Sequence, residues 1–451
     1  MSESAEAPNS WQPPLPEQPS STPGLWRTPG YRSLWFASFL LSGAYGLTWS
    51  TQAEFWDAID FDSTTIGLIG LAGWLGIPIG YMIASVISDR RSKKRQFRSA
   101  ALFMAAMTVV TLLLAVIVGM EPGWIYIAAA LFGMASGFTT AVVLGLLGDH
   151  LPRRLIGRGV VVVSLTALPH GLLVGMTVAL FPGDSSGPTW YLAIAVPLYL
   201  VGAASIRFVP DQNPTGIDQR SSLGMFKNAL FLMWRDARLK SLWIYAFAAG
   251  VLLVLLQTAF LDHLLLENEI GSTNYALTMI ARGLASLVAT IGLFFVISGS
   301  RRWTVFVAAA VGSGVTAMLV AFSVNLGWLI AVFIAFGGSA AVVGLGAIAL
   351  AMSVTRSGYF GRVAALFLLC TSMLNFGSGF ISVYVHHWFE GRVAILILGA
   401  LMLLLAIWFW RRWRQFRHLP EDPDVRERQN PLVSLAEAAA PQKAAGPNQS
   451  A

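Results

Sequence analysis

Twelve apolar stretches run along the sequence, and each is long enough to cross a lipid bilayer. A bilayer core is about 30 Å thick and needs about 20 apolar residues for each spanning helix. The pattern therefore predicts an all-α polytopic membrane protein with twelve transmembrane helices. The expected spans are residues 34–55, 65–88, 99–120, 123–147, 159–181, 188–209, 242–264, 274–299, 303–324, 326–354, 359–385 and 393–410.

The basic residues are distributed unevenly between the two sets of loops. Except for Arg282 and Arg392, the 30 Lys and Arg residues lie in, or within one helical turn of, the N-terminal segment, the even-numbered loops or the C-terminal tail. Such asymmetry is typical of cytoplasmic segments, so we expect both termini in the cytoplasm and the protein in the plasma membrane, as in a bacterial inner membrane. Acids gather near the odd-numbered loops, at Glu54, Asp57, Asp60, Asp62, Glu267 and Glu269.

Composition excludes several other classes of protein. The hydrophobic content of 55% and the charged content of 12% lie far from the values of soluble proteins. The net charge of +7 comes from residues beside spans, where anionic lipid headgroups explain it, so we expect the bilayer and no nucleic acid as a partner. The single cysteine, Cys370, allows no intramolecular disulfide.

The chain divides into two six-helix halves with polar segments around them. We expect disordered cytoplasmic tails at 1–30 and 413–451, halves at 31–209 and 241–412, and a cytoplasmic linker at 210–240. The linker should contain an amphipathic helix in the headgroup layer. Its apolar face would consist of Leu223, Phe226, Leu230, Met233 and Trp234, with Lys227, Arg235 and Arg238 elsewhere.

The two halves repeat each other at an offset of 210 residues. The segment from Ile87 to Arg91, after the second span, matches the segment from Ile297 to Arg302, after the eighth. Duplicated six-helix halves are typical of transporters, because two similar bundles can rock around a binding site between them.

The loop after the second span contains an acid followed by a basic run. It includes Asp89, Arg90, Lys94 and Arg95, and in this it resembles the major facilitator superfamily, whose pattern is Gly-x-x-x-Asp-Arg-x-Gly-x-Arg/Lys-Arg/Lys. Ser85 and Ser92 replace the two glycines of that pattern. The resemblance implies that the acid caps the eleventh helix, which should begin near residues 357–359, and closes the cytoplasmic side. The four charged residues are therefore our candidate gate. A topology anchor is the alternative.

Two further segments, residues 31–49 and 151–158, resemble bacterial exporters related to the enterobactin exporter. The chain departs from such exporters in the first helix, where Ala44 and Tyr45 stand instead of an acid. In the fifth helix only Pro169, Gly171 and Gly175 remain of the glycine-rich motif of drug/proton antiporters. Proton antiport is therefore implied by the family and not by these residues.

Arg282 is the candidate for the principal charge of a substrate site. A charge at bilayer depth costs about 2.5–3.5 kcal/mol on insertion scales, so its side chain should face protein or water. It belongs to a stripe of residues spaced four apart along the eighth span, namely Asn274, Thr278, Arg282, Ser286 and Thr290. The alternative role is a structural ion pair with Asp262 or Glu54.

Other polar residues within the spans complete the candidate site, a partly polar and partly aromatic central cavity. The candidates for substrate binding are Arg282, His170, Tyr45, Gln52, Gln257, Thr278, Ser286 and Asn375. The candidates for proton coupling are His170, Glu54 and Asp262. For each residue taken alone, a hydrogen bond between packed helices is the competing interpretation.

These observations favour secondary transport over catalysis. His386 and His387 have no evident third ligand, and neither a phosphate loop nor a nucleophile elbow occurs, so we expect no metal, no cofactor and no enzyme activity. We predict proton-coupled efflux of a small amphipathic or anionic organic solute by a monomer. The alternatives are a metabolite uniporter or importer, and a sensor or assembly factor on the same fold.

Overall fold

The computed structural model describes residues 24–50, 63–87, 92–117, 122–167, 187–210, 227, 230, 231, 233–261, 272–299, 301–322, 325–355, 359–369 and 391–416. These residues form helices and turns, and no strand occurs among them. The helices of the N-terminal half are η1 (Leu25–Arg27), α1 (Tyr31–Ser50), α3 (Ser63–Ile87), α4 (Lys93–Ile117), α5 (Pro122–His150), α6 (Arg153–Ser164), η2 (Leu165–Ala167), α8 (Gly187–Ser205) and η3 (Ile206–Phe208). Those of the C-terminal half are α10 (Ala237–Leu261), α11 (Ser272–Val296), α12 (Arg302–Val320), α13 (Leu326–Val354), the unlabelled helix Phe360–Leu369 and α15 (Gly391–Phe416).

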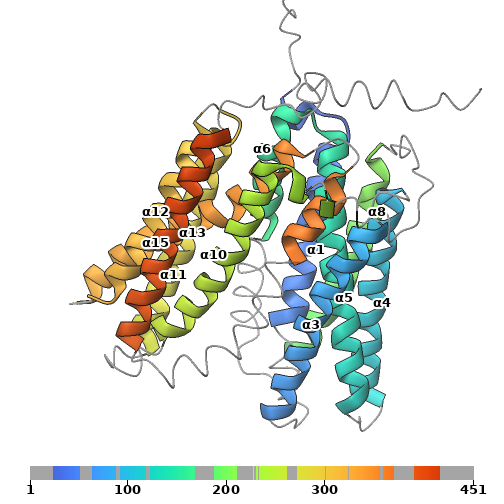
Figure 1. The fold of residues 1–451 in the computed structure, drawn as a ribbon. Helices are drawn as coiled ribbons and strands as arrows, with labels where there is room; N and C mark the ends of the chain where they lie inside the picture. Colours follow the sequence, from blue (N-terminus) through green and yellow to red (C-terminus); the bar gives the residue numbers. More distant parts are fainter. Residues whose placement is uncertain are drawn as a thin grey trace, which may run out of the picture.

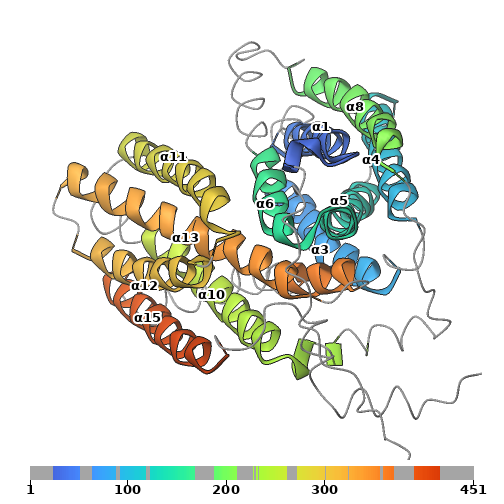
Figure 2. The same ribbon diagram turned by 90° about the horizontal axis from the view of Figure 1, so that it is seen from above.

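The helices form two bundles that stand side by side (Figures 1 and 2). The first contains α1, α3, α4, α5, α6 and α8, and the second contains α10, α11, α12, α13 and α15. Each of the twelve expected spans overlaps a described α-helix. Among the described residues, six helices are long and apolar enough to cross a membrane by length and composition, within 68–87, 93–113, 123–150, 302–320, 326–354 and 391–415.

The most extensive helix pair of the first bundle, α3 with α5, is built on glycine. Gly76 and Gly80 of α3 and Gly133 and Gly137 of α5 carry the same spacing of four residues. A Cβ atom at any of these glycines would overlap a backbone carbonyl of the facing helix. Opposed glycines let two helix backbones touch, which is how helices associate tightly where lipid provides no hydrophobic driving force.

The corresponding pair of the second bundle is α11 with α13. Gly337 of α13 faces the backbone of α11, and a Cβ atom there would lie 2.5 Å from the carbonyl oxygen of Arg282. The second and fourth helices of each half thus form the tight pair, as expected for a duplicated fold.

Both ends of the helical region are more ordered than the expected tails at 1–30 and 413–451. Leu25 is buried in the core of the first bundle, and the Trp26 ring contacts those of Tyr31 and Trp35 edge-on. At the other end α15 continues to Phe416, because Trp413 still packs against the core. The helical region thus extends past the predicted tail boundaries, through the buried Leu25 at one end and Trp413 at the other.

Candidate functional site

One end of both bundles carries the basic segments 93–98, 153–158, 235–240 and 301–302, and we call it the basic end. Here α6 of the first bundle packs against α11 and α13 of the second. The Ser298 hydroxyl donates to the Arg154 carbonyl oxygen at 2.9 Å, and the Arg158 guanidinium lies 5.4 Å from the centre of the Phe294 ring. The fifth and eighth helices, α6 and α11, therefore meet between the two halves.

The helix Phe360–Leu369 makes a second contact between the bundles at the same end. Its Phe360 ring occupies the space beside Gly148 of α5, where a Cβ atom would overlap the ring. One turn away, Gly361 lies against Gly145 of α5. Ala365 is fully buried in a cluster with side chains of α3 and α5, namely Ile77, Tyr81, Ala84 and Ala141. The eleventh helix thus seals the basic end against the first bundle.

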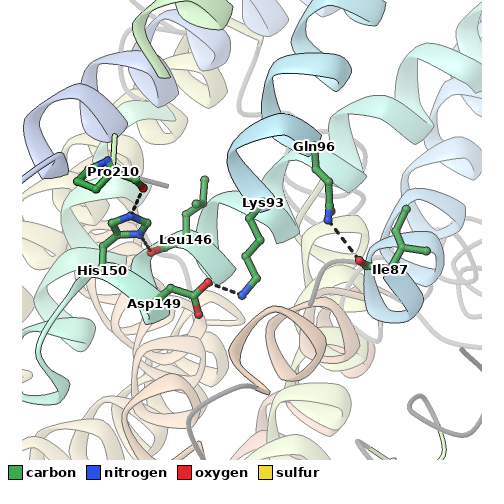
Figure 3. A network of polar contacts seen from close by, with 7 residues as sticks. All are labelled: Ile87, Lys93, Gln96, Leu146, Asp149, His150 and Pro210. Atoms are coloured by element: carbon green, nitrogen blue, oxygen red, sulfur yellow. Dashed lines mark hydrogen bonds and ion pairs between the residues drawn. The ribbon is translucent and has the colours of Figure 1, made fainter. Parts of the chain in front are cut away.

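A charged pair lies directly beside this seal (Figure 3). Lys93, the first residue of α4, forms an ion pair with Asp149 at the end of α5, and Lys93 is only 9% exposed. The methylene groups of Lys93 contact the same face of Gly145 that meets Gly361. The ion pair therefore fixes the end of α5 where α5 contacts the other bundle.

The predicted gate residues fall in different places. Asp89 and Arg90 lie outside the described residues. Lys94 donates to the carbonyl oxygens of Arg207 and Val209 at 2.8 and 2.7 Å, which places it within its own bundle. Arg95 is exposed. Among the described residues of this loop, Lys93 is the basic side chain beside the contact between bundles.

His150 ties the end of α5 to the end of the sixth span (Figure 3). Its Nδ1 atom lies 2.9 Å from the Leu146 carbonyl oxygen, and its Nε2 atom lies 2.8 Å from that of Pro210. Gly30 closes the same corner, since its φ of 77° and its contact with Pro210 exclude a side chain.

Gly148→Val should open the basic end. The new side chain meets the Phe360 ring across the two bundles, and the strain is released when the bundles separate. A cysteine at the buried Ala141, in a chain with Cys370 replaced, should then react faster with a thiol reagent from the basic side. Gly123→Val is the matched control, since Gly123 of α5 has no neighbour within 4 Å. Equal reactivity in both variants would contradict the seal.

Arg282 lies in the interface between α11 and α13. Its guanidinium is 5.3 Å from the centre of the Phe336 ring, an aromatic side chain that is itself fully buried. Gly337 lets α13 approach until it contacts both the backbone and the Cγ atom of Arg282. A planar guanidinium over a ring face is a favourable cation–π contact, and the arrangement holds the charge at a defined position within the span.

Ser286 and Thr290, which belong to the same stripe as Arg282, form hydrogen bonds to backbone carbonyls. The Ser286 hydroxyl lies 2.9 Å from the carbonyl oxygens of both Arg282 and Gly337, and Thr290 donates to the Ser286 carbonyl at 2.7 Å. Thr278 is fully buried. Short hydroxyl side chains in helices commonly donate to the carbonyl four residues earlier, and this geometry favours the packing role for Ser286.

Tyr45 belongs to an aromatic and hydroxyl cluster in the first bundle. Its ring stacks on that of Phe132 at 5.7 Å with the planes 7° apart, and its hydroxyl is hydrogen-bonded to Ser136. Phe132 in turn meets Tyr199 edge-on at 6.2 Å, and the Tyr199 hydroxyl lies 3.4 Å from that of Thr48. Stacking and hydroxyl groups on α1, α5 and α8 suit an aromatic or hydroxylated solute.

The contacts described for Tyr45 lie in the first bundle, and those described for Arg282 lie in the second. The other candidates fall on residues whose positions are not described. Gln52, Glu54, His170, Asp262 and Asn375 lie outside the described residues, as does the side chain of Gln257. These roles stay predictions.

Sequence reasoning missed the charged pair, His150 and the glycines that join helices. Asp149 carried a signal, because it is an acid at the end of a span beside a basic loop. The glycine spacing on α3 and α5 carried another, the small-residue motif of membrane helices. The sequence contained no signal for the contacts that join the halves at Gly145, Gly148 and Gly157, because these contacts depend on how the two bundles pack.

The described residues form two bundles of apolar helices, six of which are long enough to cross a membrane, and α6, α11 and the helix Phe360–Leu369 join the bundles at one end. This architecture is typical of a multi-pass membrane transport protein. Residues 34–376 match the Major Facilitator Superfamily, and the chain belongs to that family of transporters. It is accordingly a transporter and not an enzyme, with the twelve-helix fold of the family. No curated protein sequence matches the chain significantly.

Solved structures of the same family share the fold. FucP, the E. coli fucose:proton symporter, in its outward conformation, has a TM-score of 0.70 and 16% identity, covering 86% of this chain and 99% of that one. The human organic anion transporter MFSD10 (TETRAN) has a TM-score of 0.67 and 15% identity, covering 84% and 98%. The proton:xylose symporter XylE, bound to 6-bromo-6-deoxy-D-glucose, has a TM-score of 0.63 and 14% identity, covering 85% and 94%.

Proposed function

We propose that this transporter exports a small amphipathic or anionic organic solute in exchange for protons, by alternating access between the two bundles. The observation that carries the proposal is Arg282, a cation within a predicted span whose guanidinium stacks on Phe336. A cation at that depth is costly unless it is used or paired, and a carboxylate or sulfonate is the group that its planar fork recognises best. The half-buried Tyr45 ring, which stacks on the buried Phe132, offers an aromatic surface for the rest of such a solute.

Alternating access requires contacts between the bundles that can break. Among the described residues, the contacts at the basic end are those of α6 with α11 and α13 and those of the helix Phe360–Leu369 with α5. The ion pair of Lys93 with Asp149 supports this seal from within one bundle. We propose that the neighbouring Asp89 and Arg90 belong to the same gate.

Proton coupling needs a group that titrates near the substrate. We propose His170, Glu54 and Asp262 for this role, with Gln52, Gln257, Thr278 and Asn375 as further solute contacts. Symport is the competing form of coupling, and it is the activity that the names of FucP and XylE state for those proteins. Identities of 14–16% show the shared fold, so the direction of transport for this chain is argued from its resemblance to exporters.

The basic end should face the cytoplasm of a bacterial inner membrane. Reporter fusions placed in the linker at 210–240 and after residue 416 should both report a cytoplasmic location, because basic residues gather at both places. A fusion in the loop between α12 and α13 should report the opposite side. A periplasmic signal from the linker or the C-terminus would contradict the orientation.

Transport by inside-out vesicles tests the function. Vesicles that contain the protein should accumulate at least one member of a panel of aromatic carboxylates and sulfonates when their interior is made acidic. Dissipating the pH gradient should remove that accumulation. Uptake that persists without the gradient would indicate a uniporter, and the lack of uptake for every panel member in either vesicle orientation would favour a sensor.

A further inference from the structure

The linker that leads into α10 turns large apolar side chains outward. Phe231 is 63% exposed, Trp234 54% and Leu230 41%, and all three lie within an arc of about 100° of a helix. Met233 falls outside that arc and is buried in the core of the protein. The apolar face predicted from the sequence is thus divided, with Met233 anchoring the segment and the three others facing away from the protein.

Basic side chains flank these exposed rings. The Arg235 guanidinium lies 5.9 Å from the centre of the Phe231 ring, and the Lys240 ammonium lies 4.4 Å from that of Trp234. The acid between them, Asp236, accepts the backbone N–H of Arg238 at 2.8 Å and so caps the start of α10. Its carboxylate therefore faces the backbone of α10, and the outward face is aromatic and basic.

The same combination recurs at two other places on the basic end. The Arg207 guanidinium lies 4.6 Å from the centre of the Phe208 ring, which is 63% exposed. The Arg414 guanidinium lies 4.1 Å from that of Trp410. These pairs lie on η3 and α15, in different bundles (Figure 1). Exposed aromatic rings beside cations at one level of a membrane protein are typical of the boundary between acyl chains and headgroups.

We propose that the lipid-facing surface formed by Lys227, Leu230, Phe231, Trp234, Arg235 and Lys240 binds anionic phospholipid. Leu230, Phe231 and Trp234 enter the boundary of the acyl chains, and the three cations bind phosphate oxygens of the headgroups. The recurrence of the pattern on unconnected helices favours a continuous lipid surface over a single protein partner. Through Met233 and the start of α10, this contact connects the linker to the second bundle.

The test uses the full chain with Cys370 replaced and Phe231→Cys labelled with a small fluorophore. In vesicles that contain phosphatidylglycerol, a lipid that carries a nitroxide near its headgroup should quench the probe. In vesicles of phosphatidylcholine alone the quenching should fall, because the cations lose their partners. Arg235→Gln with Lys240→Gln should produce the same loss in phosphatidylglycerol vesicles.

The matched control is the double variant Arg411→Gln with Arg412→Gln, which removes the same charge from exposed positions of α15 at the basic end. This variant should leave the quenching unchanged. Equal quenching in both lipid compositions would overturn the requirement for an anionic lipid. A probe that stays unquenched in both would overturn the membrane contact and leave the surface to an acidic protein partner.

Discussion

Gly80→Val should destabilise the protein more than any other single change considered above. The valine Cβ would overlap the Met134 carbonyl oxygen and crowd the Phe138 amide nitrogen, and both are backbone atoms that no rotamer change can move. The α3 and α5 helices must therefore separate along their whole contact. Overpacking a protein core lowers the free energy of unfolding by about 1–3 kcal/mol. Because the valine would meet backbone atoms, we expect a loss of about 3 kcal/mol for Gly80→Val.

Thermal unfolding of the purified protein in detergent, followed by tryptophan fluorescence, measures the effect. Gly70→Val is the matched control, because Gly70 lies on the same helix and has no neighbour within 4 Å. It should unfold near the wild-type temperature, whereas Gly80→Val should unfold well below it or fail to accumulate in membranes. Equal unfolding temperatures for the two variants would contradict the glycine-to-backbone packing of α3 and α5.

Arg282→Ala should abolish solute binding while the protein remains folded. If the guanidinium binds an anionic group in a buried site, its loss costs about 2–5 kcal/mol of binding free energy, equivalent to a factor of about 30 to 5,000 in Kd. Arg282→Lys should keep part of the affinity, because the charge survives while the planar contact with Phe336 and the bidentate fork are lost.

A structural ion pair predicts a different pattern for the same variants. If Arg282 serves only to neutralise Asp262 or Glu54, Arg282→Ala should lower expression and thermal stability by leaving that acid unpaired, and the added change Asp262→Asn or Glu54→Gln should restore both. Expression, unfolding temperature and solute binding of the single and double variants separate the cases. Restored stability together with intact binding would exclude the role in solute recognition.

The sequence predicted the fold well because membrane helices obey a simple rule. Each span must satisfy its own backbone hydrogen bonds, so the length of an apolar stretch locates a helix without knowledge of its neighbours. The tail predicted from 413 overlaps the last residues of α15, which ends at Phe416. In the structure Trp413 packs on the core at this end of α15.

The candidate site was predicted only where a single residue carries its own signal. Arg282 is conspicuous because a charge is costly inside a span, whereas its stacking on Phe336 depends on α13, 54 positions further along the chain. For Lys94, a signal in the sequence led to the wrong position. This residue matches the family motif in sequence, but it is bonded to the carbonyls of Arg207 and Val209, while its neighbour Lys93 lies at the contact between bundles.

The central claim is that solute and proton movements are coupled through a site that contains Arg282. The most direct measurement records the pH inside liposomes that contain the purified protein and a trapped pH indicator, while an aromatic carboxylate gradient is imposed without a pH gradient. The account predicts that protons move opposite to the solute, so that solute entering the liposomes raises the internal pH. This pH change should occur in the wild type and be lost in Arg282→Ala. Solute movement without any pH change, or an equal pH change in Arg282→Ala, would contradict it.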